Sequence, residues 1–148
     1  MSVNILLILK SNLIAIIAYL CICLILLMLR YAMMFFGILE SLERMIGAGI
    51  FTLAFLFLCF LAGKLFISNS HNLLISVLSL LPLYIIIAVI VYISYGNPKS
   101  YGVLLAIPIH PISEIISYFF QIKIKYCYLL TSLLPSLSMW IGMLSKKA

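Results

Sequence analysis

Residues 30–49 read RYAMMFFGILESLERMIGAG, and this stretch decides how many helices the chain forms. It contains two of the three acidic residues, Glu40 and Glu43, together with Arg30 and Arg44. Long apolar runs flank it on both sides. The four charges therefore lie either in a hydrated turn between two helices or inside one long helix, and the two interpretations imply different proteins.

The composition of the whole chain is that of an integral membrane protein. Of its 148 residues, 67% are hydrophobic and 8% are charged, and a soluble domain of this size cannot bury so much apolar surface. The net charge is +6, but most of the basic residues stand singly or in pairs at the ends of apolar runs, where they can reach lipid headgroups. The pattern predicts lipids, and not nucleic acid, as partners.

Four apolar segments predict transmembrane helices within a single all-α membrane domain that covers residues 1–148. The segments are 13–29, 32–62, 73–95 and 126–144. Insertion of residues 102–121 would add a fifth crossing. The basic residues divide almost evenly between the two sides of the membrane, so they do not fix the orientation.

A shorter segment, residues 111–122, has the pattern of an amphipathic helix that lies in the membrane interface. Its first residue is Pro111, and Glu114 falls in the predicted first turn, two features that favour the start of a helix. Apolar and polar residues fall on opposite faces of this helix. The apolar face consists of Ile112, Ile115, Ile116, Phe119 and Ile122, and the polar face of Ser113, Glu114, Ser117, Tyr118 and Gln121.

If the charged stretch is helical, its charges and glycines share one face. Gly37, Glu40, Arg44 and Gly47 recur at spacings of three and four residues, and Glu43 lies beside them. Glu40 precedes Arg44 by four positions, which is the favourable order for an ion pair on a helix. Small residues in line with charges indicate a face that packs against another protein helix.

Two interpretations of this face remain open. In the first, residues 37–44 form a hydrated turn and the charges have no further role. In the second, a helix starts just after Arg30 and carries Glu40 about 15 Å along its axis, near the middle of the membrane. A carboxylate at that depth is costly unless it is paired, so Glu40 would then be a candidate for a proton path, with Glu43, Arg44 and Arg30 near it.

His110 and Glu114 form a second candidate polar site. The chain has only two histidines, His71 and His110, and neither has a Cys, Glu or His partner at ligand spacing on the same predicted element. Glu114 follows His110 by four positions, but we expect Pro111 to interrupt the helix that would align them. The sequence therefore predicts no bound metal or cofactor and no catalytic site of its own.

The first half of the chain resembles the small membrane-arm subunit of respiratory complex I known as subunit 4L. Ile25-Leu26-Leu27 ends the first span, Arg30 marks a basic turn, and Glu40 follows in the next apolar run, as in that family. Residues 73–95 match the family's third helix in placement. That helix normally carries a second buried glutamate, where this chain has Ala88-Val89.

A second stretch resembles a different subunit of the same complex. IGAGIFTLAFLF, residues 46–57, is similar to the glycine-rich and phenylalanine-rich third helix of subunit 6. Both resemblances imply a non-catalytic membrane subunit of a proton-translocating NADH:quinone oxidoreductase. Its partners would be the other membrane subunits, and its location the mitochondrial inner membrane or a bacterial plasma membrane. Glu40 would be the protonatable group, tuned by Glu43 and Arg44.

Two other functions fit the same composition. One is a stand-alone small membrane protein of a bacterial defence or toxin-immunity system, which would bind a partner in the bilayer or form a homo-oligomer. The other is a small homo-oligomeric channel in which a ring of Glu40 or Arg44 side chains lines the pore. The oligomeric state of the chain when expressed alone separates these alternatives from a respiratory subunit.

Overall fold

The protein is built from helices throughout the part of the chain that the structure describes. The computed structural model describes residues 2–35, 44–67, 77–78, 80–94 and 107–147. The helices are α1 (Ser2–Phe35), α3 (Arg44–Phe66), α5 (Leu81–Ser94), α6 (His110–Phe120), α7 (Ile124–Thr131) and α8 (Leu133–Leu144), followed by a 3-10 turn at Ser145–Lys147. The all-α prediction is confirmed for these residues.

Three stretches of helix are long and apolar enough to cross a membrane. They are Ile5–Met33, Gly49–Phe66 and Ile124–Leu144. The third consists of α7 and α8, which are joined at Ser132. The described part of α5 is also apolar but shorter, at Leu81–Ser94. These lengths are compatible with an integral membrane protein.

α1 begins earlier than the first predicted span, which was 13–29. It starts at Ser2 and contains Lys10 within its helical turns. Lysine is a good helix former, so a charge at the edge of an apolar run does not end the helix. The apolar run therefore predicted only part of α1 and missed the helical residues that precede it.

The end of α1 also differs from the predicted boundary. The second span was expected to cover residues 32–62, but α1 continues to Phe35 and α3 begins at Arg44. Residues 32–35 contain neither glycine nor proline, so nothing in their backbone ends the first helix. A second helix that starts just after Arg30 is therefore not formed.

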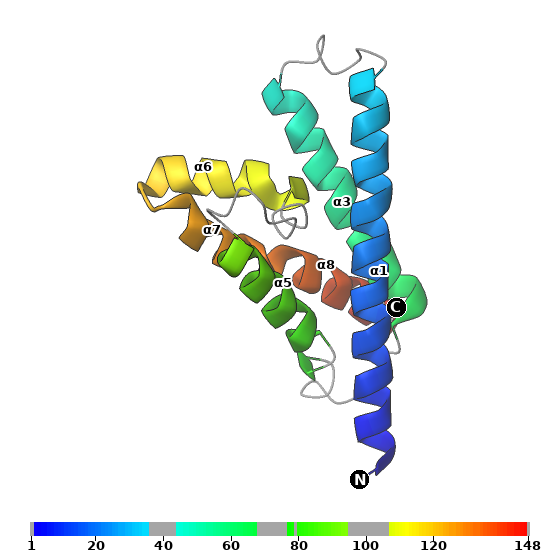
Figure 1. Cartoon of the computed structure of the whole chain (residues 1–148). Coiled ribbons are helices and arrows are strands. Elements are labelled where there is room, and N and C mark those ends of the chain that lie inside the picture. The colour runs from blue at the N-terminus through cyan, green and yellow to red at the C-terminus, as the bar shows by residue number, and fades with distance from the viewer. Residues whose placement is uncertain (1, 36–43, 68–76, 79, 95–106, 148) are drawn as a thin grey trace.

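One stripe of α1 is buried and packs toward α3. The side chains of the stripe recur at spacings of one to four residues, as one helix face requires. They belong to Ser11, Ala15, Tyr19, Ile22, Cys23 and Leu26. In the middle of the stripe the ring of Tyr19 meets that of Phe55 of α3 edge to face, with 5.8 Å between the ring centroids. The two helices lie alongside each other and run in opposite directions (Figure 1).

α3 and α8 cross with their backbones in direct contact. A Cβ atom on Gly63 would lie 2.0 Å from the carbonyl oxygen of Met139, and one on Gly142 would lie 2.0 Å from the carbonyl oxygen of Phe60. No other residue type leaves room for this approach, which is how small residues hold membrane helices together. The crossing fixes α8 against the C-terminal half of α3.

α6 and α7 form a helical hairpin beside this crossing. Gln121 ends α6 in the left-handed region, with φ of 52°, and the Ser117 hydroxyl donates a hydrogen bond of 2.7 Å to the carbonyl oxygen of Ile122. These contacts turn the chain back within three residues so that α7 begins at Ile124. α6 runs across the long direction of α1 (Figure 1). The predicted amphipathic segment, 111–122, therefore forms a separate helix.

Candidate functional site

The described basic residues fall into two groups along the molecule. Lys10 and Arg30 lie twenty positions apart on α1, which is about 30 Å along a helix. Because α3 runs opposite to α1 (Figure 1), Lys64 near its C-terminus lies toward the Lys10 end. The ammonium group of Lys146 donates to the carbonyl oxygen of Ile67 at 2.9 Å and joins the same end.

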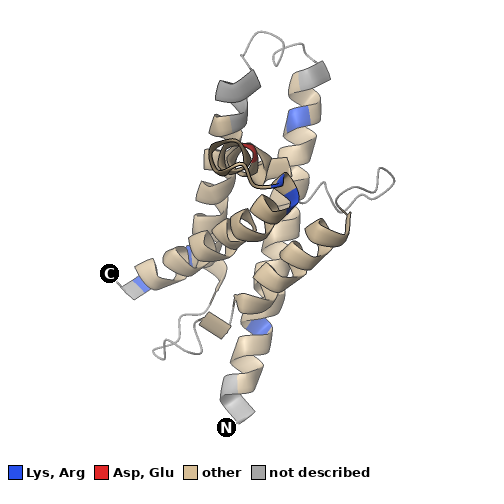
Figure 2. Cartoon of the chain, turned by 90° about the vertical axis from the view of Figure 1, so that its left-hand side faces the viewer, with Lys and Arg blue, Asp and Glu red and all other residues tan. Residues whose placement is uncertain are grey.

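The second group lies toward the other end of the molecule. Figure 2 shows the acidic residue of α6 and the basic residues of the α6–α7 turn below the end of α1, at a level between the two basic residues of that helix. These residues are Glu114, Lys123 and Lys125, and the Arg30 side chain of α1 is also exposed.

The predicted cluster around Arg30 is only partly covered by the structure. Arg30 is an exposed residue in the last turns of α1, and Arg44 is the first residue of α3. Glu40 and Glu43 lie outside the described residues. Arg44 at a helix start, twenty positions before Lys64, has the spacing of the basic pair on α1.

The structure brings together the two residues of the second predicted polar site, His110 and Glu114. Nε2 of His110 and a carboxylate oxygen of Glu114 are 3.1 Å apart. We expected Pro111 to prevent this contact, and that expectation is wrong. Proline in the first turn of a helix removes an N–H that has no intrahelical partner, so α6 begins at His110 and continues through Pro111. Because of that start, Glu114 lies beyond the first turn, contrary to the prediction.

Tyr128 of α7 extends this pair into a chain of three polar groups. Its hydroxyl is hydrogen-bonded to Nδ1 of His110, and the two rings stack with 5.9 Å between their centroids. Tyr128 is 3% exposed, whereas the side chains of His110 and Glu114 are 43% and 61% exposed. The imidazole thus connects a carboxylate in contact with solvent to a phenol inside the protein.

A second polar link lies next to this chain. The hydroxyls of Ser113 and Thr131 are 2.7 Å apart, and both are buried. Each also donates to a backbone carbonyl oxygen of its own helix, Ser113 to Ile109 at 3.1 Å and Thr131 to Cys127 at 3.0 Å. Ser113 therefore lies on the side of α6 that packs against α7, although the sequence predicted it on the polar face of an interfacial helix.

The predicted apolar face of α6 consequently points partly outward. Phe119 is 74% exposed, and Ile115 and Ile122 are also exposed. In a soluble protein the apolar side chains of such a helix would be buried and the polar ones exposed, which is the opposite of this arrangement. In a membrane it is the expected one, because lipid covers the apolar side chains while polar groups pair with each other inside the protein.

The three-membered chain supports proton exchange and offers no nucleophile. When imidazole is neutral, Nε2–H can donate to Glu114 while Nδ1 accepts from the Tyr128 hydroxyl, and when it is charged both nitrogens donate. Imidazole is the side chain that most readily gains and loses a proton near neutral pH. Within the described residues, no three His, Cys, Asp or Glu side chains come together as metal ligands do.

Sequence reasoning found two of the three members of this site. Tyr128 lies on another helix, eighteen positions beyond His110. No spacing rule links residues across a turn whose geometry is unknown, and Tyr128 is one of nine tyrosines. Only the fold of the α6–α7 hairpin identifies it.

Comparison with known proteins adds no relative. The chain matches no protein family model, no curated protein sequence and no solved structure. The site is therefore interpreted from its own geometry.

Proposed function

We propose that the protein is a non-catalytic integral membrane subunit that exchanges protons through Glu114, His110 and Tyr128 at one face of the membrane. The observation that carries this proposal is the hydrogen-bonded connection from an exposed carboxylate through an imidazole to a buried phenol. Such a connection lets a proton move between the membrane surface and the protein interior without a free charge in hydrocarbon.

The spacing of basic residues supports the membrane placement that this proposal needs. Three pairs of basic residues, on or just beyond the membrane-length helices, lie twenty or twenty-one positions apart, which is about 30 Å along a helix, the hydrocarbon thickness of a bilayer. The pairs are Lys10 with Arg30 in α1, Arg44 with Lys64 in α3, and Lys125 of α7 with Lys146 of the 3-10 turn after α8. In this placement α5 belongs to a fourth crossing, and α6 lies at the interface.

The more specific form of the proposal follows from the resemblance to complex I. The chain would then be a membrane-arm subunit of a proton-translocating respiratory assembly, in the mitochondrial inner membrane or a bacterial plasma membrane. In this form the chain of Glu114, His110 and Tyr128 would be a protonatable site of the subunit, in addition to Glu40, which the resemblance implies and which lies outside the described residues.

The proposal is tested by substituting each of the two histidines of the chain. His110 belongs to the proposed site, and His71 serves as the control. A tagged chain is expressed in the cells that encode it, and the assembly that contains it is isolated in mild detergent and reconstituted into vesicles with a pH-sensitive dye. We expect His110→Gln to slow proton translocation by about a hundredfold or more, the scale of losing a positioned proton-transfer group, and His71→Gln to leave it unchanged. Equal translocation by both variants, with the assembly intact, contradicts the proposal.

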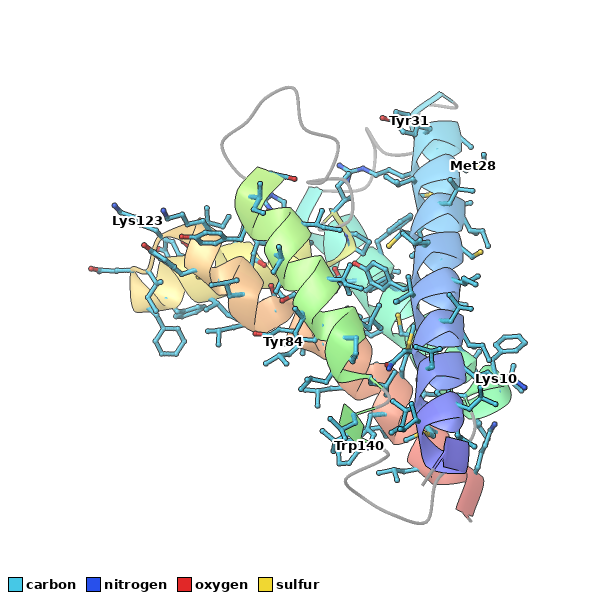
Figure 3. All side chains as sticks on the ribbon, turned by 60° about the horizontal axis from the view of Figure 1, so that its bottom comes forward. Lys10, Met28, Tyr31, Tyr84, Lys123 and Trp140 are labelled. Carbon is cyan, nitrogen blue, oxygen red and sulfur yellow. The ribbon has the colours of Figure 1, made fainter. Side chains whose placement is uncertain are left out.

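A self-associating membrane protein is the second candidate, and the outer surface of α1 favours it. Large apolar side chains remain exposed along almost the whole helix, and Met28 points away from the other helices (Figure 3). This surface would be covered by lipid, by other subunits or by a second copy. If the chain purified alone forms a stable homo-oligomer, the second candidate replaces the first.

A further inference from the structure

The α6–α7 turn carries positive charge that no described acidic residue neutralises. Lys123 is exposed at the tip of the hairpin and points away from the protein (Figure 3). Lys125 follows one position into α7. Glu114 is the acidic residue of the described chain, and its carboxylate is paired with His110. The two ammonium groups are therefore available to an anion from outside the chain.

Aromatic rings hold one of these charges in place. The ammonium nitrogen of Lys125 lies 5.0 Å from the ring centroid of Tyr126 and 5.8 Å from that of Tyr92 on α5. Both distances are within the range of cation–π attraction. Lys125 therefore has a defined position between α5 and α7, which a freely mobile surface lysine lacks.

The surroundings of the two lysines match the headgroup region of a bilayer. The last residues of α6, Tyr118, Phe119 and Phe120, are 82%, 74% and 70% exposed. Exposed aromatic residues next to basic ones are typical of segments that sit between the acyl chains and the headgroups. A soluble anion would explain the lysines but leave the three exposed rings without a partner.

We infer that the α6–α7 turn binds the phosphate of an anionic phospholipid, with Lys123 and Lys125 on the headgroup and the end of α6 beside the glycerol and upper acyl region. The inference rests on the interfacial placement of α6 in the proposed function. It adds the partner: a lipid with net negative charge, because two uncompensated cations within three residues are better balanced by such a headgroup than by a zwitterionic one.

The test compares lipids retained by the intact chain. Full-length protein is reconstituted into bilayers of phosphatidylglycerol and phosphatidylcholine in equal amounts, and the lipids that stay bound are counted by native mass spectrometry. We expect the wild-type chain to retain phosphatidylglycerol preferentially. Replacing Lys123 and Lys125 by glutamine should reduce this preference by about fivefold for each lysine.

The matched control is the double variant Lys10→Gln and Lys64→Gln, which removes the same charge from the other end of the molecule. It should keep the phosphatidylglycerol bound at the α6–α7 turn. The inference is overturned if the Lys123 and Lys125 variant retains as much phosphatidylglycerol as the wild type, or if the control loses as much as that variant. All four lysines are exposed or half-exposed, so circular dichroism should report unchanged helix content in both variants.

A depth measurement separates this inference from the proposed function. A nitroxide attached at Phe119→Cys, in a chain whose exposed Cys21 is replaced by alanine, reports in pure phosphatidylcholine whether α6 lies at the interface when no anionic lipid is present. A label in bulk water or at the bilayer centre overturns the interfacial placement, and with it both proposals. A label at headgroup depth, together with no phosphatidylglycerol preference, overturns the lipid site alone.

Discussion

Two helix contacts in this protein are made in opposite ways. α3 and α8 meet through Gly63 and Gly142, with backbone against backbone. α6 and α7 meet through side-chain hydrogen bonds, His110 to Tyr128 and Ser113 to Thr131. The first kind of contact depends on shape and the second on chemistry.

In the proposed membrane placement, the difference follows from the solvent around each contact. In hydrocarbon the hydrophobic effect does not drive helices together, so close van der Waals packing must do so, and it requires small residues. Near the membrane surface water competes for polar groups, so a polar contact must be shielded to be stable. Ser113 and Thr131 are buried accordingly, and Tyr128 is nearly so. Substitutions that add a side-chain atom at the glycines should therefore destabilise the α3–α8 contact strongly. Substitutions that remove a hydrogen-bonding group should destabilise the α6–α7 contact less.

The largest effect is expected at the glycine crossing. Gly142→Ala and Gly63→Ala each place a Cβ atom 2.0 Å from a backbone oxygen, and backbone cannot move aside as a side chain can. Each should lower the free energy of unfolding by about 3 kcal/mol or more. The measurement is loss of helical circular dichroism during titration with sodium dodecyl sulfate.

Gly49→Ala is the matched control for the crossing. A Cβ atom at this position of α3 meets nothing within 4 Å. The variant should be as stable as the wild type or more stable, by up to about 1 kcal/mol, because alanine favours the helix. Equal losses in Gly49→Ala and Gly142→Ala would mean that glycine acts through the helix backbone and not through the α3–α8 contact.

An intermediate effect is expected at the polar contact. Tyr128→Phe keeps the stacked ring but removes the hydroxyl that bonds to His110, and it should cost about 1 to 2 kcal/mol. A double-mutant cycle with His110→Gln, followed by the same detergent titration, isolates the pair. A coupling energy near zero would show that the ring stacking, and not the hydrogen bond, joins α6 to α7.

Glu114→Gln should have a smaller effect than Tyr128→Phe in the same detergent titration. It should lower the free energy of unfolding by about 0.5 kcal/mol or less, because the carboxylate is largely exposed.

The two contacts also differ in how much of them the sequence could predict. The α6 segment was identified from its periodicity and its proline, with bounds of 111–122 against an observed His110–Phe120. The last span was predicted at 126–144, and the structure has a helical stretch long and apolar enough to cross a membrane at Ile124–Leu144. Both predictions rest on local patterns, which a single sequence contains.

The glycine crossing and Tyr128 could not be predicted for a different reason. In α1 and α3 the exposed and the buried residues are both mostly apolar, so the sequence does not mark which face is buried. Seven glycines and nine tyrosines are present, and only the fold selects Gly63, Gly142 and Tyr128. The boundary between α1 and α3 could not be predicted either. No glycine or proline before Phe35 marks the end of α1, so the sequence contains no signal for a start of α3 as late as Arg44.

The smallest effect on the free energy of unfolding is expected at two buried serine hydroxyls, one in each pair of helices. Ser113 of α6 bonds to Thr131, whereas the buried Ser136 hydroxyl of α8 has no hydrogen-bond partner among the described residues. Ser113→Ala should cost about 0.6 kcal/mol, the average for hydrogen bonds between membrane helices, since Thr131 keeps its bond to the carbonyl oxygen of Cys127. Ser136→Ala should be neutral or stabilising, because it removes a buried polar group that gains nothing from the protein. If Ser136→Ala is the more damaging of the two in the same detergent titration, the α8 side of the molecule relies on a polar contact after all, and the contrast between the two helix pairs does not hold.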